Sequence, residues 1–290
     1  YALWLAQLLA IMAFSMRAPF LPFYIEELGV TSTDQQALWA GLINAGGALI
    51  MAIAAPIWGI LADRYGRKPM VLRSMYVATF TIGLMGLATA AWHLLALRFV
   101  EGAFTGTVTA VAALAAATVP RDRVGFGLGL MQMAVFSGSS FGPLVGGLLS
   151  DVVGYRATFG IASAFMLTGG LIVTFIVQER FQPVSKAERQ RSGASTWALL
   201  GIPIVLTMVL AMFMIRGTST AIQPILPLFV ETLGGHGGLS EATLSGLILG
   251  AQGVTSAVAA IYLGRLGDRI GHRRILGVAA FAAGFLYLPM

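Results

Sequence analysis

The sequence has no cysteine and very few charged residues. Only 10% of its 290 residues are Asp, Glu, Lys or Arg, whereas a soluble domain carries about 25%. The absence of cysteine excludes a disulfide framework and thiolate metal sites. Apolar side chains are abundant instead: 57% of the residues are hydrophobic, and the mean hydropathy is +0.84. Such a composition predicts a chain surrounded largely by lipid.

Apolar stretches about long enough to cross a bilayer recur along the chain. We predict an all-α membrane protein with about nine transmembrane helices, the last one incomplete, and expect both chain ends to lie within apolar runs. The helices are expected at residues 2–25, 38–62, 70–91, 94–118, 124–150, 155–177, 200–230, 241–263 and 275–290.

The positive charges gather in alternate breaks between these helices. Fourteen of the 18 Lys and Arg residues fall in one set of breaks, and the opposite set holds Arg156 alone. Because basic loops stay in the cytoplasm, we place the first set there, in a multi-pass membrane protein. This arrangement accounts for the net charge of +6 without nucleic-acid binding.

The two halves of the chain contain a repeat. A shift of 205 residues aligns PFLPFYIEELG (19–29) with PILPLFVETLG (224–234). Repeated sets of helices are typical of transporters that bind substrate between two halves. We therefore predict a six-helix bundle at 1–178, a cytoplasmic linker at 179–196, and an incomplete second bundle with helices seven to nine at 197–290.

Several motifs resemble those of a known family. GILADRYGRK resembles the loop 2–3 signature of the major facilitator superfamily, GSSFGPLVGG resembles the fifth-helix motif of drug:proton antiporters, and RFVEG resembles their fourth-helix pattern. FLPFYIEELGV, WGILADRYGRK, RFQPVSK and RLGDRIG are similar to the MdtG-type branch of bacterial multidrug exporters. The resemblance covers nearly the whole chain and implies two six-helix bundles related by pseudo-twofold symmetry.

The first motif is a candidate conformational switch. An acid among cations at a moving interface can exchange partners between inward-open and outward-open states; a simple topology anchor is the alternative. The resemblance supports the switch for Asp63, Arg64, Gly66 and Arg67. The full set, with its weaker second copy, is Gly59, Asp63, Arg64, Gly66, Arg67, Gly264, Asp268, Arg269 and Gly271.

The fifth helix carries small residues four positions apart. Such a stripe lets a neighbouring helix approach closely, and Pro143 interrupts the backbone hydrogen bonding. Simple close packing is one interpretation, and a leak-tight hinge between the two halves, favoured by the antiporter resemblance, is the other. The hinge candidates are Gly138, Gly142, Pro143, Gly146 and Gly147.

Charged side chains within the predicted helices are costly and are candidates for function. Arg98 and Glu101 lie three residues apart and can pair on one helix. They form either a self-neutralising ion pair or a proton-coupling site in which Glu101 carries the proton.

Arg17 and Arg216 have no acid nearby in the sequence. They lie on helices one and seven, which line the central cavity in the superfamily that the chain resembles. Two unpaired guanidinium groups there would favour anionic substrates; pairing with acids of helices ten to twelve is the alternative.

These features predict a proton-coupled exporter of small amphipathic compounds or drugs that works by alternating access. A carrier of organic anions or phosphate esters that uses Arg17 and Arg216 is the second hypothesis, and a structural or sensor protein the third. The partners expected are a small-molecule substrate, protons and the lipid bilayer, and the protein is expected to be a monomer. No catalytic constellation, metal cluster or cofactor motif is present in the sequence, so we expect no enzyme, cofactor or metal.

Overall fold

The computed structural model describes residues 1–120, 124–179, 225–233 and 239–270, with isolated positions between 205 and 217 and between 277 and 282. Within these residues all regular structure is helical. The helices are α1 (Ala2–Ser15), α2 (Leu21–Glu27), α3 (Thr33–Tyr65), α4 (Arg67–Met85), α5 (Ala91–Phe104), α6 (Thr107–Thr118), α7 (Val124–Ile176), α11 (Leu226–Leu233) and α12 (Glu241–Ile270).

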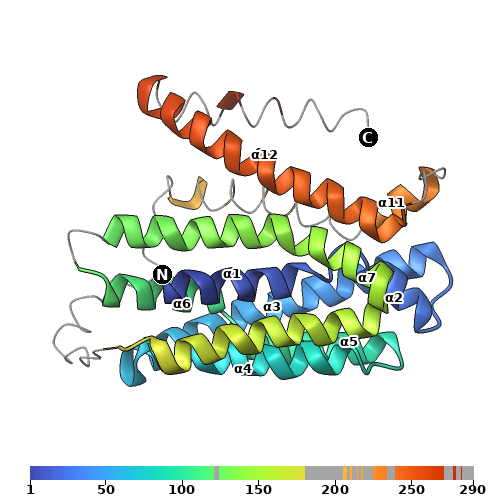
Figure 1. Ribbon diagram of the computed structural model, residues 1–290, viewed down its shortest axis with the longest axis horizontal. Helices are drawn as coiled ribbons and strands as arrows, with labels where there is room; N and C mark the ends of the chain where they lie inside the picture. The colour runs from blue at the N-terminus through green and yellow to red at the C-terminus, as the bar shows by residue number, and fades with distance from the viewer. Residues whose placement is uncertain are drawn as a thin grey trace.

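The long element α7 consists of two helices joined at Gly154. This glycine has a φ of 82° and a ψ of 165°, which are not helical. The chain reverses direction there, so that the two parts of α7 run past each other (Figure 1). The predicted break between the fifth and sixth helices, at 150–155, is therefore confirmed.

Two predicted helices are interrupted. The first splits into α1 and α2, with Arg17 in the gap, and the fourth splits into α5 and α6 at Thr105 and Gly106. Gly106 has a φ of +129°, a conformation that side chains with a Cβ rarely adopt. The prediction of continuous helices at 2–25 and 94–118 is wrong at these two points, and both lie beside the candidate site.

Glycines set the packing around α1. A Cβ built on Gly138 would lie 2.7 Å from Cβ of Ile11, and one on Gly146 would overlap the carbonyl oxygen of Met16. On the other part of α7, a Cβ on Gly169 would lie 3.1 Å from the carbonyl oxygen of Ala6. Helix α1 is thus held between the two parts of α7.

The outer surface of the bundle is apolar. Phe80, Leu87 and Phe175 are all at least 70% exposed. In the described residues, three stretches are long and apolar enough to cross a membrane: α3 (Thr33–Tyr65), α5 together with α6 (Ala91–Thr118), and α7 (Val124–Ile176). Apolar side chains outside and charged ones inside fit a chain with lipid as its solvent.

The structure supports the repeat locally. Helix α2 begins at Leu21 and helix α11 at Leu226, which is 205 residues later. The two repeated segments, 19–29 and 224–234, therefore each contain a short helix that begins at the equivalent position. The predicted seventh and ninth helices lie largely outside the described residues, as does the linker apart from Glu179.

Candidate functional site

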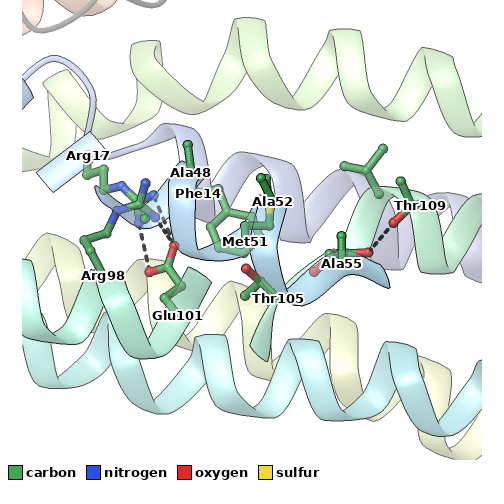
Figure 2. Close-up of a pocket in the computed structure, with 14 residues that line it drawn as sticks. Phe14, Arg17, Ala48, Met51, Ala52, Ala55, Arg98, Glu101, Thr105 and Thr109 are labelled. Atoms are coloured by element: carbon green, nitrogen blue, oxygen red, sulfur yellow. Dashed lines mark hydrogen bonds and ion pairs between the residues drawn. The ribbon is translucent and has the colours of Figure 1, made fainter. Parts of the chain in front are cut away.

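Three charged side chains meet inside the bundle. Two nitrogens of Arg17 donate to the two carboxylate oxygens of Glu101, at 3.3 and 3.2 Å. Arg98 also donates to Glu101, from one helical turn away. The Glu101 side chain is only 2% exposed, so two guanidinium groups surround one buried carboxylate (Figure 2). The predicted pairing of Arg98 with Glu101 is confirmed.

The expectation that Arg17 lacks an acidic partner is wrong. Its partner is Glu101, 84 residues away in the chain. The break between α1 and α2 places Arg17 beside α5, and this contact cannot be read from sequence spacing. Arg216, the other half of the predicted clamp, lies outside the described residues.

The backbone of α3 makes room for Arg98. A Cβ added to Gly47 would lie 3.0 Å from Cζ of Arg98, and Nε of Arg98 donates to the carbonyl oxygen of Ile43 at 3.3 Å. One turn along α5, a Cβ on Gly102 would overlap the Gly47 carbonyl. The close crossing of α3 and α5 therefore depends on glycine and fixes the direction of the Arg98 side chain.

The three charges lie in the wall of a cavity of about 360 Å³. Its remaining lining is mostly small and apolar and follows α3 toward the start of α6, as Figure 2 shows; it includes Phe14, Ala48, Met51, Ala52, Ala55 and Val108. A second cavity of about 270 Å³ is also lined by Arg17 and Arg98, together with Asn44 and Pro22, but Glu101 does not line it. The two arginines thus stand between two hollows, each in the size range of small-molecule sites or just below it.

The candidate switch lies at the junction of α3 and α4. Gly66 has a φ of +97° and lets the chain turn sharply between the two helices. The carboxylate of Glu179 accepts hydrogen bonds from the backbone N–H groups of Arg67 and Lys68, at 2.8 to 3.0 Å. Sequence reasoning missed Glu179, which was assigned to the linker. An acid at the start of a helix is favourable because it accepts from free N–H groups and complements the helix dipole.

The cations of this junction bind carbonyl oxygens of other helices. Arg67 donates to Ala113 at 3.2 Å, and Lys68 donates to Thr174 at 2.9 Å. The guanidinium of Arg64 lies 5.3 Å from the ring of Tyr65, and a Cβ on Gly59 would meet nothing within 4 Å. In the second copy, the side chains of Asp268 and Arg269 and the surroundings of Gly264 on α12 are not described, and Gly271 lies outside the described residues.

The hinge candidates face two different helices. Gly138, Gly142 and Gly146 pack against α1, whereas Pro143 and Gly147 meet α12. A Cβ on Gly147 would lie 2.5 Å from the carbonyl oxygen of Ala242. Neighbouring helices therefore approach closely along the stripe, as both interpretations require, and the hinge stays a prediction. The helix continues through Pro143, and its non-helical point is Gly154.

Acidic residues of α2, α11 and α12 lie near enough to influence one another. Partial burial and the carboxylates of Glu26 and Glu241 raise the pKa of Glu231 above its ordinary value. Glu26 and Glu231 are equivalent positions of the repeat. The two copies therefore bring like charges together.

Nearly the whole chain matches a known protein family. The model of the Major Facilitator Superfamily matches residues 3–290. The chain belongs to this superfamily. It is 41% identical over 287 residues to the multidrug resistance protein MdtG of Citrobacter koseri and 39% identical to that of Escherichia coli K12; the match covers 99% of the chain and 70% of each relative. The resemblance to the MdtG-type branch is thus confirmed.

Solved structures show the same fold. A bacterial homologue of the human lysosomal transporter Spinster, in an inward-facing and unoccupied conformation, gives a TM-score of 0.74 at 18% identity; the match covers 94% of the chain and 62% of that protein. The all-α major facilitator fold is therefore confirmed. The protein is a multi-pass membrane transporter and not an enzyme.

Proposed function

We propose that this protein is a proton-coupled exporter of small amphipathic compounds or drugs, acting as a monomer in a bacterial inner membrane with its basic loops in the cytoplasm. Its MdtG relatives, at about 40% identity, are named multidrug resistance proteins. The observation that carries the proton role is the buried carboxylate of Glu101, held by two guanidinium groups on a cavity wall. An ionisable group at such a position is expensive and marks a functional site.

Protonation of Glu101 would change what holds α1 to α5. The carboxylate is the shared acceptor of Arg17 and Arg98. A neutral carboxyl group would attract both guanidinium groups far less, and Arg17 sits in a break between helices rather than within one. Proton binding would therefore favour a different position of the α1–α2 break. A proton that binds one conformation more tightly than another shifts the balance between the two conformations.

The lining of the larger cavity supports an amphipathic substrate. Its volume of about 360 Å³ is that of a small-molecule site, and apolar side chains make up most of its wall. The anion-carrier hypothesis loses support because Arg17 is engaged by Glu101.

Alternating access would rock a bundle formed by 1–178 against one formed by 197–290, across the linker 179–196. We assign the switch to the loop around Asp63, Arg64 and Arg67 and to its second copy. The glycines of the fifth helix, which pack on both α1 and α12, would keep the moving surfaces tight.

A transport assay in proteoliposomes tests the proton role. We expect Glu101→Gln to abolish efflux of a fluorescent drug driven by a pH gradient, while binding of that drug in detergent stays measurable. Glu27→Gln is the matched control, because Glu27 also pairs with an arginine, Arg156, but on the surface. Unchanged gradient-driven efflux by Glu101→Gln would refute the proposal.

A further inference from the structure

The contact between α7 and α12 is a seam of small residues. On α7 it is made by Ser140, Pro143, Gly147 and Asp151. Facing them are Ser240, which directly precedes α12, and Thr243, Gly246, Gly250 and Gly253 of α12. A Cβ on Gly246 would lie 2.5 Å from the carbonyl oxygen of Pro143. Two backbones packed so closely cannot slide past each other freely, and the seam therefore has a defined closed position.

Asp151 lies at the end of this seam and joins the two helices. Its carboxylate accepts hydrogen bonds from the hydroxyl of Ser240, with oxygen–oxygen distances of 2.5 Å, and from the hydroxyl of Thr243. The Ser240 hydroxyl in turn accepts the backbone N–H of Thr243 at 3.1 Å. Asp151 thus binds the first turn of α12, where the helix dipole also favours a negative charge.

The two helices are close at the Asp151 end and separate toward the other end of α12 (Figure 1). Among the described residues, the close approaches run from Asp151 to Ser140 on α7 and end at Gly253 on α12. A seam that is shut at one end and diverges at the other is what a carrier open to one side requires.

We propose that Asp151 is a positioning residue of the transport cycle: it latches α7 to the start of α12 and holds this end of the transporter closed. Release of the hydroxyl groups of Ser240 and Thr243 is the step that lets this end open. The latch contributes to the balance between the two access states and has no contact with the cavity of Arg17 and Glu101. The inference rests on the proposed alternating access, but it is tested without substrate or proton gradient.

The lack of cysteine makes the test direct, because introduced thiols are the only ones present. Spin labels at Val153 and Leu239, both exposed, report on the latched end, and labels at Phe126 and Tyr262 report on the other end. Distance distributions are measured by double electron–electron resonance in lipid nanodiscs. We expect Asp151→Ala to raise the ratio of open to closed distances at the latched end by about tenfold, and Asp151→Asn by less, because two charge-assisted hydrogen bonds are lost or weakened.

Two further variants separate a latch from a general structural effect. Asp34→Asn removes an acid from the first turn of α3 and should leave both distributions as in the unmodified protein. The swap Asp151→Ser with Ser240→Asp keeps a hydroxyl opposite a carboxylate, and Asp is a good residue at a helix start. We expect the swap to restore the closed distances that Asp151→Ser alone loses.

Each result decides the matter. Unchanged distances at the latched end in Asp151→Ala, equal broadening at both ends, or failure of the swap to restore closure would overturn the latch. If the latched end opens as expected but the unmodified protein exports no drug in the proteoliposome assay, the proposed function fails and the latch stands.

Discussion

The guanidinium of Arg17 lies 3.2 Å from the carboxylate of Glu101, although 84 residues separate them in the chain. The contact joins a break in the first predicted helix to the interior of the fourth. It also changes the charge balance of the site. With Arg98 the cluster holds two positive charges and one negative charge. Removal of the carboxylate therefore leaves two positive charges beside each other inside the bundle.

This charge balance predicts an order of stabilities. Glu101→Gln should lower the melting temperature in detergent more than Arg17→Gln does, because the second change leaves the neutral pair of Arg98 and Glu101. The double variant should be more stable than Glu101→Gln alone, with a coupling free energy of about 0.5–3 kcal/mol. Strictly additive losses would show that the two side chains do not interact.

Gly47→Ala tests how Arg98 is positioned. The added methyl group would lie 3.0 Å from the guanidinium carbon, so Arg98 or α3 must shift by a few tenths of an ångström, which disturbs the contact with Glu101. We expect gradient-driven efflux to fall about tenfold, as small misplacements in a charged site do. Gly41→Ala on the same helix meets nothing within 4 Å and should transport normally; similar losses in both variants would contradict this explanation.

Gly146→Ala tests the packing of α7 on α1. Its methyl group would overlap the Met16 carbonyl oxygen, and backbone gives way less easily than a flexible side chain. Overpacking of this kind costs about 1–3 kcal/mol, so the melting temperature should drop. Gly129→Ala, in the same part of α7 with nothing within 4 Å, should be neutral or slightly stabilising. A stable Gly146→Ala would mean that the two helices can move apart without cost.

Glu179→Gln tests the cap of α4. The amide can accept fewer of the backbone hydrogen bonds of Arg67 and Lys68 and has no charge to match the helix dipole. We expect a loss of about 0.5–2 kcal/mol and faster hydrogen exchange in the first turn of α4, measured by mass spectrometry. Glu27→Gln, which breaks a half-exposed ion pair with Arg156, should leave that turn unchanged.

Much of the architecture could be predicted from the sequence, because lipid imposes a simple rule of length and polarity on each helix. The break at 150–155 and the equivalence of Leu21 and Leu226 both followed from composition and repeat. The break before Pro19 carried a usable signal, since the residue before a proline avoids helical geometry. The break at Gly106 could not be predicted in this way, because glycine is common within membrane helices and does not by itself indicate a break.

The contacts of the site were harder to predict. Spacing along one helix gave the pair of Arg98 and Glu101, but it could not give Arg17 or Glu179. Both of these make contacts that depend on how separate helices pack. The packing of the glycine stripe against both α1 and α12 could not be predicted for the same reason. A helical period shows that residues share one side of a helix, but it does not show which neighbouring helix lies on that side.

The gap between α5 and α6 is fastened from two directions. Trp58 of α3 donates to the carbonyl oxygen of Ala103 at 2.6 Å, and Arg73 of α4 donates to that of Phe104 at 3.1 Å. Arg73 also stacks on Trp58, 3.3 Å from its ring centre. These carbonyls are available only because α5 stops there. Any displacement of the end of α5 must therefore disturb its hydrogen bonds to both α3 and α4, the two helices that the basic loop at Gly66 joins.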